Sequence, residues 1–267
     1  MQLGAVFPQT EIGPDPSGIA DFATAIENAG FDLILGYDHV LGVDPADADF
    51  DGAYDNDDPF HEPFTLFGFL AGYTESITLG TGILILPQRQ TALVAKQAAE
   101  VDILCDGRLR LGVGVGWNER EYEALGMDFG NRGRRIEEQV EVLRRLWTED
   151  VVSVDGRWHA LDGVGINPLP IQRPIPVWMG GEAEPVLRRT GRLADAWLPP
   201  GHWKAHDKSL EPMAEKVETI RDHAIEAGRD PDELRIVPRI QPTGDSDAWV
   251  ERARKWADLG ATHIVMD

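Results

Sequence analysis

The chain has 267 residues, of which 42% are hydrophobic, and a formal net charge of −21. So acidic a surface repels nucleic acid and anionic lipid, and neither is expected as a partner. No stretch approaches the ~18 consecutive apolar residues of a membrane span, and the N-terminal "MQLGAVFPQT" lacks the basic and apolar regions of a secretory signal. The single cysteine, Cys105, falls on an apolar helix face, and a cytoplasmic location is expected. The acidic excess fits a GC-rich genome and adaptation to high salt equally well.

Short apolar strands alternate with amphipathic helices along the chain. Strands are expected at 3–8, 32–37, 77–85, 109–116, 176–180, 195–199, 235–240 and 262–266. Helices are expected after each of the first seven, at 17–30, 63–74, 91–105, 132–149, 184–192, 209–227 and 247–258. This strict alternation predicts a parallel sheet closed into a (β/α)8 TIM barrel, an α/β fold in which residues 1–267 form one domain. Because the sequence ends at the eighth strand, we expect either a further helix beyond it or another chain to cover that flank.

Two stretches interrupt this alternation. Residues 40–62 form a long acidic loop after the second strand, and residues 150–175 form an insertion before the fifth. Within the insertion, Asp155-Gly156 lies between two strand-like runs and predicts a hairpin turn. Loops of this length inside a compact domain are usually functional or mobile.

Asp38 and His39 directly follow the buried second strand, in "LILGYDHVLG". In a TIM barrel the active site lies at the C-terminal ends of the strands. Histidine titrates near neutrality and can transfer a proton, and a carboxylate can orient it or bind a ligand. A solvated cap is the structural alternative, but the position at a strand end favours a site.

Glycines mark the ends of two further strands. In "PVWMGGEAEP", Gly180-Gly181 precede a helix with Pro185 in its first turn, so free N–H groups and the helix dipole could bind a phosphate. In "LGVGVGWNEREYEALG", alternating glycines would let a flat ring approach the strand end. Their spacing is not that of a dinucleotide fingerprint. Without a ligand, the first motif would be an ordinary tight turn between strand and helix, and the second would serve tight packing inside the barrel.

Two patterns resemble metal sites, but neither is sufficient to predict one. Residues 47–58 place Asp47, Asp49, Asp51, Gly52 and Asp58 at EF-hand loop positions, but the final glutamate and a preceding helix are lacking, which favours a solvated acidic loop. His202 and His206 lie four residues apart with no third ligand nearby. We therefore expect no metal.

The block "LVAKQAAEVDILCDGRLRLGVGVGWNEREYEALG", with "GYDHV" before it and "PVWMGG" after it, resembles the luciferase-like flavin and deazaflavin oxidoreductases over nearly the whole chain. The resemblance implies a barrel with a flavin-type ring in its mouth, a small-molecule substrate and, in our interpretation, a homodimer. Two branches of this family compete: one uses coenzyme F420 for hydride transfer, and the other uses FMN and oxygen. A metal-dependent barrel enzyme would need a ligand cluster such as H-x-H, which the sequence lacks. A non-catalytic flavin-binding relative stays open.

The resemblance also assigns roles to individual residues. It implies that His39 handles the substrate proton and that Asp38 meets the cofactor ring. The remaining positions matched to cofactor contacts are Gly82, Ile83, Val115, Gly116, Asn118, Gly180, Gly181, Glu182 and Ala183. The Gly82–Ile83 bond is predicted to be cis, as a bulge behind the ring, because glycine before the bond lessens crowding in the cis geometry.

Two departures from the family pattern narrow the prediction. Trp117 stands where the sugar-phosphate dehydrogenases of the deazaflavin branch place a catalytic glutamate, which argues against a sugar-phosphate substrate. Val115 stands where FMN-dependent members can carry a phosphate-binding arginine. We therefore predict an F420-dependent oxidoreductase, with an FMN-dependent monooxygenase as the alternative. The loops 40–62 and 200–208, which would shape the substrate pocket, do not reveal the substrate.

Overall fold

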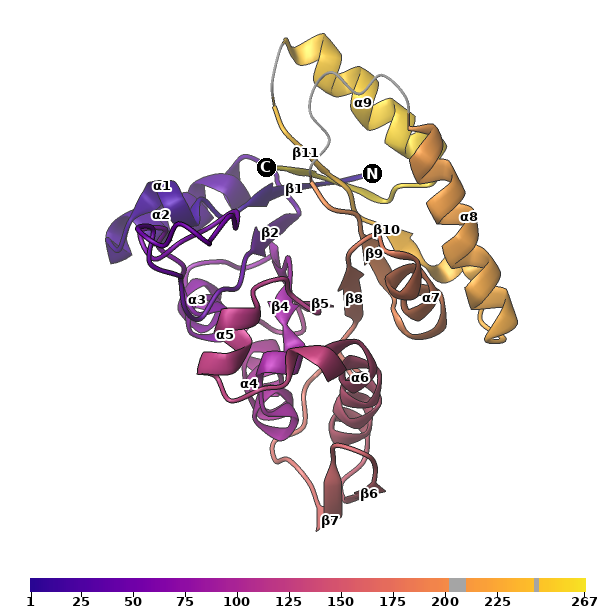
Figure 1. The fold of residues 1–267 in the computed structure, drawn as a ribbon. Helices are drawn as coiled ribbons and strands as arrows, with labels where there is room; N and C mark the ends of the chain where they lie inside the picture. Colours follow the sequence, from indigo (N-terminus) through magenta and orange to yellow (C-terminus); the bar gives the residue numbers. More distant parts are fainter. Residues whose placement is uncertain (202–209, 243–244) are drawn as a thin grey trace.

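In the computed structural model, residues 1–201, 210–242 and 245–267 are described. A parallel sheet curls around a central axis, and helices cover its outer face (Figure 1). Its strands are β1 (Gln2–Val6), β2 (Leu33–Gly36), β3 (Thr78–Thr81), β4 (Leu84–Ile85), β5 (Leu109–Gly114), β8 (Val177–Gly180), β9 (Ala196–Leu198), β10 (Arg235–Ile236), β11 (Arg239–Ile240) and β12 (His263–Met266). The predicted α/β barrel is confirmed.

The sheet closes through one short segment of chain. The strand order is β10-β9-β8-β5-β3-β2-β1-β12-β11, with β4 also paired to β5. β10 and β11 are the two halves of the expected strand 235–240, separated by Val237 and Pro238. The first half pairs with β9, at Arg235 beside Ala196, and the second pairs with β12, at Arg239 beside Val265. Since this segment bonds to both edges of the curled sheet, it completes the ring.

The long helices follow the strands as expected. They are α2 (Pro16–Asn28), α3 (Pro63–Ala71), α4 (Thr91–Leu104), α6 (Arg132–Thr148), α7 (Glu184–Leu193), α8 (Glu211–Glu226) and α9 (Ser246–Asp258). Two short helices, α1 (Gln9–Ile12) and α5 (Glu119–Ala124), were not predicted. Asp15 caps α2 and Asp245 caps α9, each by accepting bonds from backbone N–H groups of the first turn. Within the described ranges, no helix combines the length and apolar character needed to cross a membrane.

Apolar side chains from both faces of the sheet form the core. The barrel interior is filled by Leu33, Leu35, Trp178, Leu198 and Val265, while the outward faces pack on the helices. Burial on both faces explains why these strands read as continuous apolar runs. Cys105 ends α4 in this core and is fully buried, as expected, and burial raises the pKa of its thiol.

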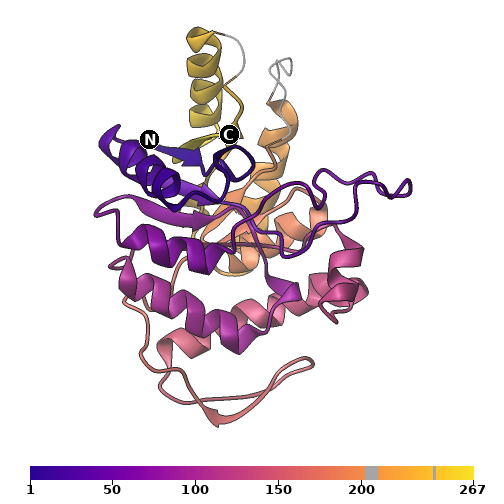
Figure 2. The same ribbon diagram turned by 90° about the vertical axis from the view of Figure 1, so that its left-hand side faces the viewer.

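The insertion before β8 forms a separate antiparallel hairpin. Its strands, β6 (Val152–Asp155) and β7 (Ala160–Val164), flank the turn predicted at Asp155-Gly156. The hairpin projects from the side of the barrel, and the long loop 40–62 extends from another edge (Figure 2). The Gly82–Ile83 peptide bond, between β3 and β4, is cis, which confirms the prediction.

His263 lies inside the barrel, at the start of β12. It is only 4% exposed, and its ring centroid lies 5.6 Å from that of Trp178. Burial, together with the positive charges of Arg235 and Arg110, lowers the pKa of His263 to about 4. The folded chain therefore holds this imidazole uncharged at pH values where the unfolded chain protonates it.

This difference makes stability dependent on pH. In the unfolded chain His263 has a pKa of about 6.5, so below this pH the unfolded chain binds a proton that the folded chain does not. The free energy of unfolding therefore decreases as the pH falls from 6.5 toward 4. Between pH 7 and pH 5, His263→Gln should lose less unfolding free energy than the wild type, by about 2 kcal/mol. Urea unfolding at several pH values and constant salt measures this difference. His223→Gln, on the outer helix α8, is the control and should behave like the wild type. If the free energy of unfolding changes with pH in the same way in all three proteins, the pKa of His263 is not lowered by folding.

Candidate active site

A cleft of about 440 Å³ opens at the C-terminal ends of the strands. Four predicted cofactor positions line it from β8 and the start of α7, and four more line it from the β3–β4 and β5 ends. These residues are Gly180, Gly181, Glu182, Ala183, Gly82, Ile83, Val115 and Gly116. The fold thus brings eight of the ten predicted cofactor positions into one cavity. Its size is that of a small-molecule or cofactor site.

Glycines allow the side chain of Ile83 to lie on the floor of this cleft. A Cβ atom added to Gly114 would lie 2.7 Å from Ile83, and one added to Gly180 would lie 2.5 Å from it. Larger residues at either position would therefore displace Ile83. Gly181 has φ +124°, which other residues rarely adopt, so the chain needs glycine to turn here from β8 into α7. The floor of the cleft therefore consists of Ile83 and of glycines without side chains, and a planar ring could lie on this apolar surface.

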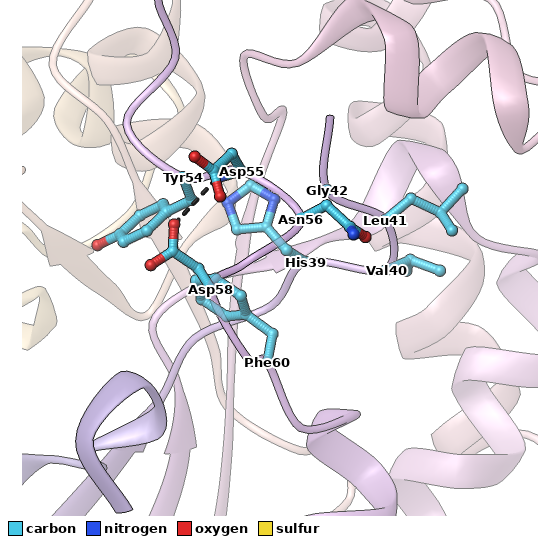
Figure 3. Close-up of a pocket in the computed structure, with 9 residues that line it drawn as sticks. All are labelled: His39, Val40, Leu41, Gly42, Tyr54, Asp55, Asn56, Asp58 and Phe60. Atoms are coloured by element: carbon cyan, nitrogen blue, oxygen red, sulfur yellow. Dashed lines mark hydrogen bonds between the residues drawn. The ribbon is translucent and has the colours of Figure 1, made fainter. Parts of the chain in front are cut away.

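His39 lies in a second cavity, of about 210 Å³, next to the cleft (Figure 3). Its ring centroid is 4.9 Å from that of Phe60, 5.7 Å from that of Tyr54 and 5.7 Å from that of Trp117. Trp117 also lines the cleft. The indole therefore lines the cleft and also contacts His39, so His39 lies close to the cleft without lining it.

Glu121, which the sequence did not single out, contacts His39 directly. It is 2% exposed, and one carboxylate oxygen lies 3.3 Å from Nδ1 of His39 and accepts a bond from the Gln88 amide. The other oxygen accepts bonds from the backbone N–H groups of Val40 (2.6 Å) and Leu41. Burial alone would raise the pKa of Glu121, but these hydrogen bonds outweigh it and hold the pKa below its usual value. The carboxylate therefore stays charged and favours a proton on Nδ1 of His39.

Asp38 lines neither cavity. Its carboxylate accepts bonds from the backbone N–H of Ile85 (2.9 Å) and from the Arg89 guanidinium (2.8 Å). Burial raises the pKa of this carboxyl, and the charge of Arg89 acts against that increase. Asp38 thus holds β4 in place immediately after the Gly82–Ile83 bulge. Its contact with a cofactor ring stays a prediction.

Asn118 also serves the scaffold in this structure. It is buried and caps α5, since its side-chain oxygen accepts a bond from the Glu121 N–H. This cap stabilises the start of the short helix α5, which positions Glu121 beside His39. A contact between Asn118 and the cofactor stays a prediction.

The acidic loop is held by bonds within the protein. Asp47 pairs with Arg120 of α5, and Gly52 packs so closely on Trp117 that an added Cβ would lie 2.4 Å from its ring. Across the described ranges, no group of three or more His, Cys, Asp or Glu side chains is arranged to hold a metal ion. His202 and His206 lie outside the described residues.

Comparison with known proteins identifies the family. The model of the luciferase-like monooxygenases matches residues 2–263. This chain belongs to that family. The luciferase-like assignment makes it an oxidoreductase and confirms the resemblance read from the sequence.

Individual relatives agree with the luciferase-like assignment. An uncharacterized protein of Mycobacterium tuberculosis is 33% identical over 209 residues, which cover 78% of this chain and 68% of the relative. The F420-dependent glucose-6-phosphate dehydrogenase of Nakamurella multipartita is 30% identical over 254 residues, 91% of this chain and 69% of the relative. The structure of the coenzyme F420-dependent tetrahydromethanopterin reductase of Methanopyrus kandleri matches with a TM-score of 0.80 and 17% identity, covering 99% of this chain and 92% of the reductase. That match confirms the fold.

The Glu121 contact makes a prediction about the His39 tautomer. In protein labelled with nitrogen-15 histidine, neutral His39 should carry its proton on Nδ1, because the carboxylate can only accept. In Glu121→Gln the side-chain amide can donate to Nδ1, and the population should move toward the Nε2-protonated form. Two-dimensional NMR reports the tautomer directly, and His39→Asn assigns the signal.

Glu123→Gln is the matched control, since Glu123 is exposed on the same helix. It should leave the His39 signals unchanged. Wild-type His39 protonated on Nε2, or equal effects of both variants, would show that Glu121 does not set the tautomer.

Proposed function

We propose that this protein is a coenzyme F420-dependent oxidoreductase that transfers a hydride between the deazaflavin and a small organic substrate. The observation that carries the proposal is the adjacency of a glycine-lined cleft to a histidine held by a buried carboxylate. The names of the Nakamurella dehydrogenase and the Methanopyrus reductase, both F420-dependent, support the choice of cofactor.

The residues of the cleft fit such a cofactor. Ile83 and Val115 offer apolar surface to a flat ring, and the glycines at 114 and 180 leave the space that the Ile83 side chain occupies. Ala183 is the N-cap of α7, and no side chain caps this helix. The N-terminus of α7 can therefore receive a phosphate through backbone N–H groups and the helix dipole.

In this proposal His39 moves the substrate proton. When bound, the deazaflavin accepts or donates the hydride. With Nδ1 held by Glu121, the Nε2 atom of His39 is free to accept a proton from a substrate hydroxyl or return it to a carbonyl. Trp117, Tyr54 and Phe60 surround the imidazole and limit the access of water to it.

An FMN-dependent monooxygenase on the same barrel is the second candidate, and the name of the family model favours it. Val115 lines the cleft where family resemblance would allow a phosphate-binding arginine, so this position offers no charge to an FMN phosphate. The cation that lines the cleft in the described chain is Arg239, whose charge is shared with Asp267 at 3.4 Å. These features favour the deazaflavin.

We also infer a cytoplasmic enzyme that acts as a homodimer. The location is supported by a single cysteine buried in the core, and the dimer by family resemblance alone.

Ala183→Asp tests the phosphate position without weakening the fold. Asp is a favoured N-cap residue, so the variant should have a free energy of unfolding about 1 kcal/mol higher than that of the wild type. Its negative charge would lie where the cofactor phosphate is proposed to bind, and F420 affinity should fall by about tenfold. Thermal unfolding and titration of cofactor fluorescence measure the two effects separately.

Ala183→Asn is the matched control, because it caps the helix without adding charge. Its F420 affinity should lie between those of the wild type and Ala183→Asp. If Ala183→Asp binds F420 as tightly as the wild type while gaining stability, the phosphate lies elsewhere.

A further inference from the structure

The cavity beside His39 is enclosed by aromatic rings and acidic side chains. Tyr54 and Phe60 pack against each other with ring centroids 5.0 Å apart, and both face the imidazole. Asp55 and Asp58 line the same cavity (Figure 3). The rest of the lining consists of residues 40–42 and Asn56.

Backbone bonds hold both carboxylates in place. Asp55 accepts a bond from the Asp57 N–H at 2.8 Å, and Asp58 accepts one from the Asp55 N–H at 2.9 Å. Each bond uses one oxygen and leaves the second for another partner. Neither carboxylate belongs to an ion pair among the described residues, unlike Asp47 in the same loop, which pairs with Arg120.

The charge of this cavity is opposite to that needed by an anionic substrate. Among the described residues that line it, none is lysine or arginine. The arginine of the neighbouring cleft, Arg239, lines the space assigned to the cofactor. Aromatic faces and carboxylates both attract cations, and two carboxylates near one small cavity repel phosphate or sulfonate groups.

We propose that the cavity beside His39 recognises the positively charged end of a small substrate, of the class of amino alcohols or quaternary ammonium alcohols. This inference rests on the proposed function, in which His39 acts on the substrate. Tyr54 and Phe60 would provide the aromatic walls around the cation, and Asp55 and Asp58 the compensating charge. The same arrangement excludes sugar phosphates.

The test measures binding of choline to the protein without cofactor. Its comparison ligand is the uncharged isostere in which a tert-butyl group replaces the trimethylammonium group; isethionate serves as the small anion. Choline should bind about tenfold or more tightly than the isostere and should shift the His39 signals in the labelled protein, while isethionate should cause no shift. Equal binding of choline and its isostere would overturn the proposal.

Variants distinguish binding of the cation in this cavity from its attraction by the acidic surface as a whole. Asp55→Asn and Asp58→Asn keep an oxygen for the loop bonds, and each should weaken choline binding by about fivefold at constant ionic strength. Asp57→Asn removes the same charge from an exposed position that does not line the cavity, and it should change affinity by less than twofold. Equal losses in all three variants would show that the whole acidic surface attracts the cation and would overturn the proposal.

Because this measurement needs no F420, its result is independent of the cofactor. Failure of F420 binding with a preserved preference for choline would refute the proposed function and leave the cation site standing. Normal F420 binding without that preference would refute the cation site alone.

Discussion

Glu121 accepts hydrogen bonds from segments that lie far apart in the sequence, and the arrangement of the site depends on it. Its two oxygens bind His39 and the backbone at Val40 and Leu41 after β2, and the Gln88 amide after β4. A charged carboxylate is stable at 2% exposure only because so many donors replace water around it. The same bonds direct the imidazole of His39 and fix the start of the loop that forms its cavity. Removing this charge would loosen His39 and the wall of its cavity together.

The second part of the site, the cleft, depends on glycines at the strand ends, because they have no side chains to fill it. Gly114 and Gly180 leave space for Ile83, and Ile83 in turn forms the floor of the cleft. Asp38 holds the chain immediately beyond, through the N–H of Ile85. The cleft is thus shaped by close backbone packing, whereas the neighbouring cavity is shaped by aromatic rings and charge. A cofactor that needs a flat surface and a substrate that needs a specific charge would each meet a suitable environment.

Much of the fold could be predicted because it follows from local patterns. Buried parallel strands read as apolar runs, and Asp155-Gly156 marked its hairpin through turn chemistry alone. The division of 235–240 into two strands could not be predicted, because closure of the ring depends on which edges meet in space. Glu121 was missed for a similar reason: "NEREYEALG" reads as a polar segment, and only the fold shows that one of its carboxylates is buried against a histidine 82 residues away. The partner of Asp38 was hidden in the same way, since Arg89 lies 51 residues further along the chain.

The central claim is that the cleft holds a deazaflavin and not FMN. Titration of the purified protein with F420 and with FMN, each in oxidised and reduced form, tests it most directly. We expect micromolar binding of F420 with negligible binding of FMN, because the cleft offers an apolar floor and backbone N–H groups but no arginine at position 115 for the FMN phosphate. Tight binding of FMN without binding of F420 would contradict it.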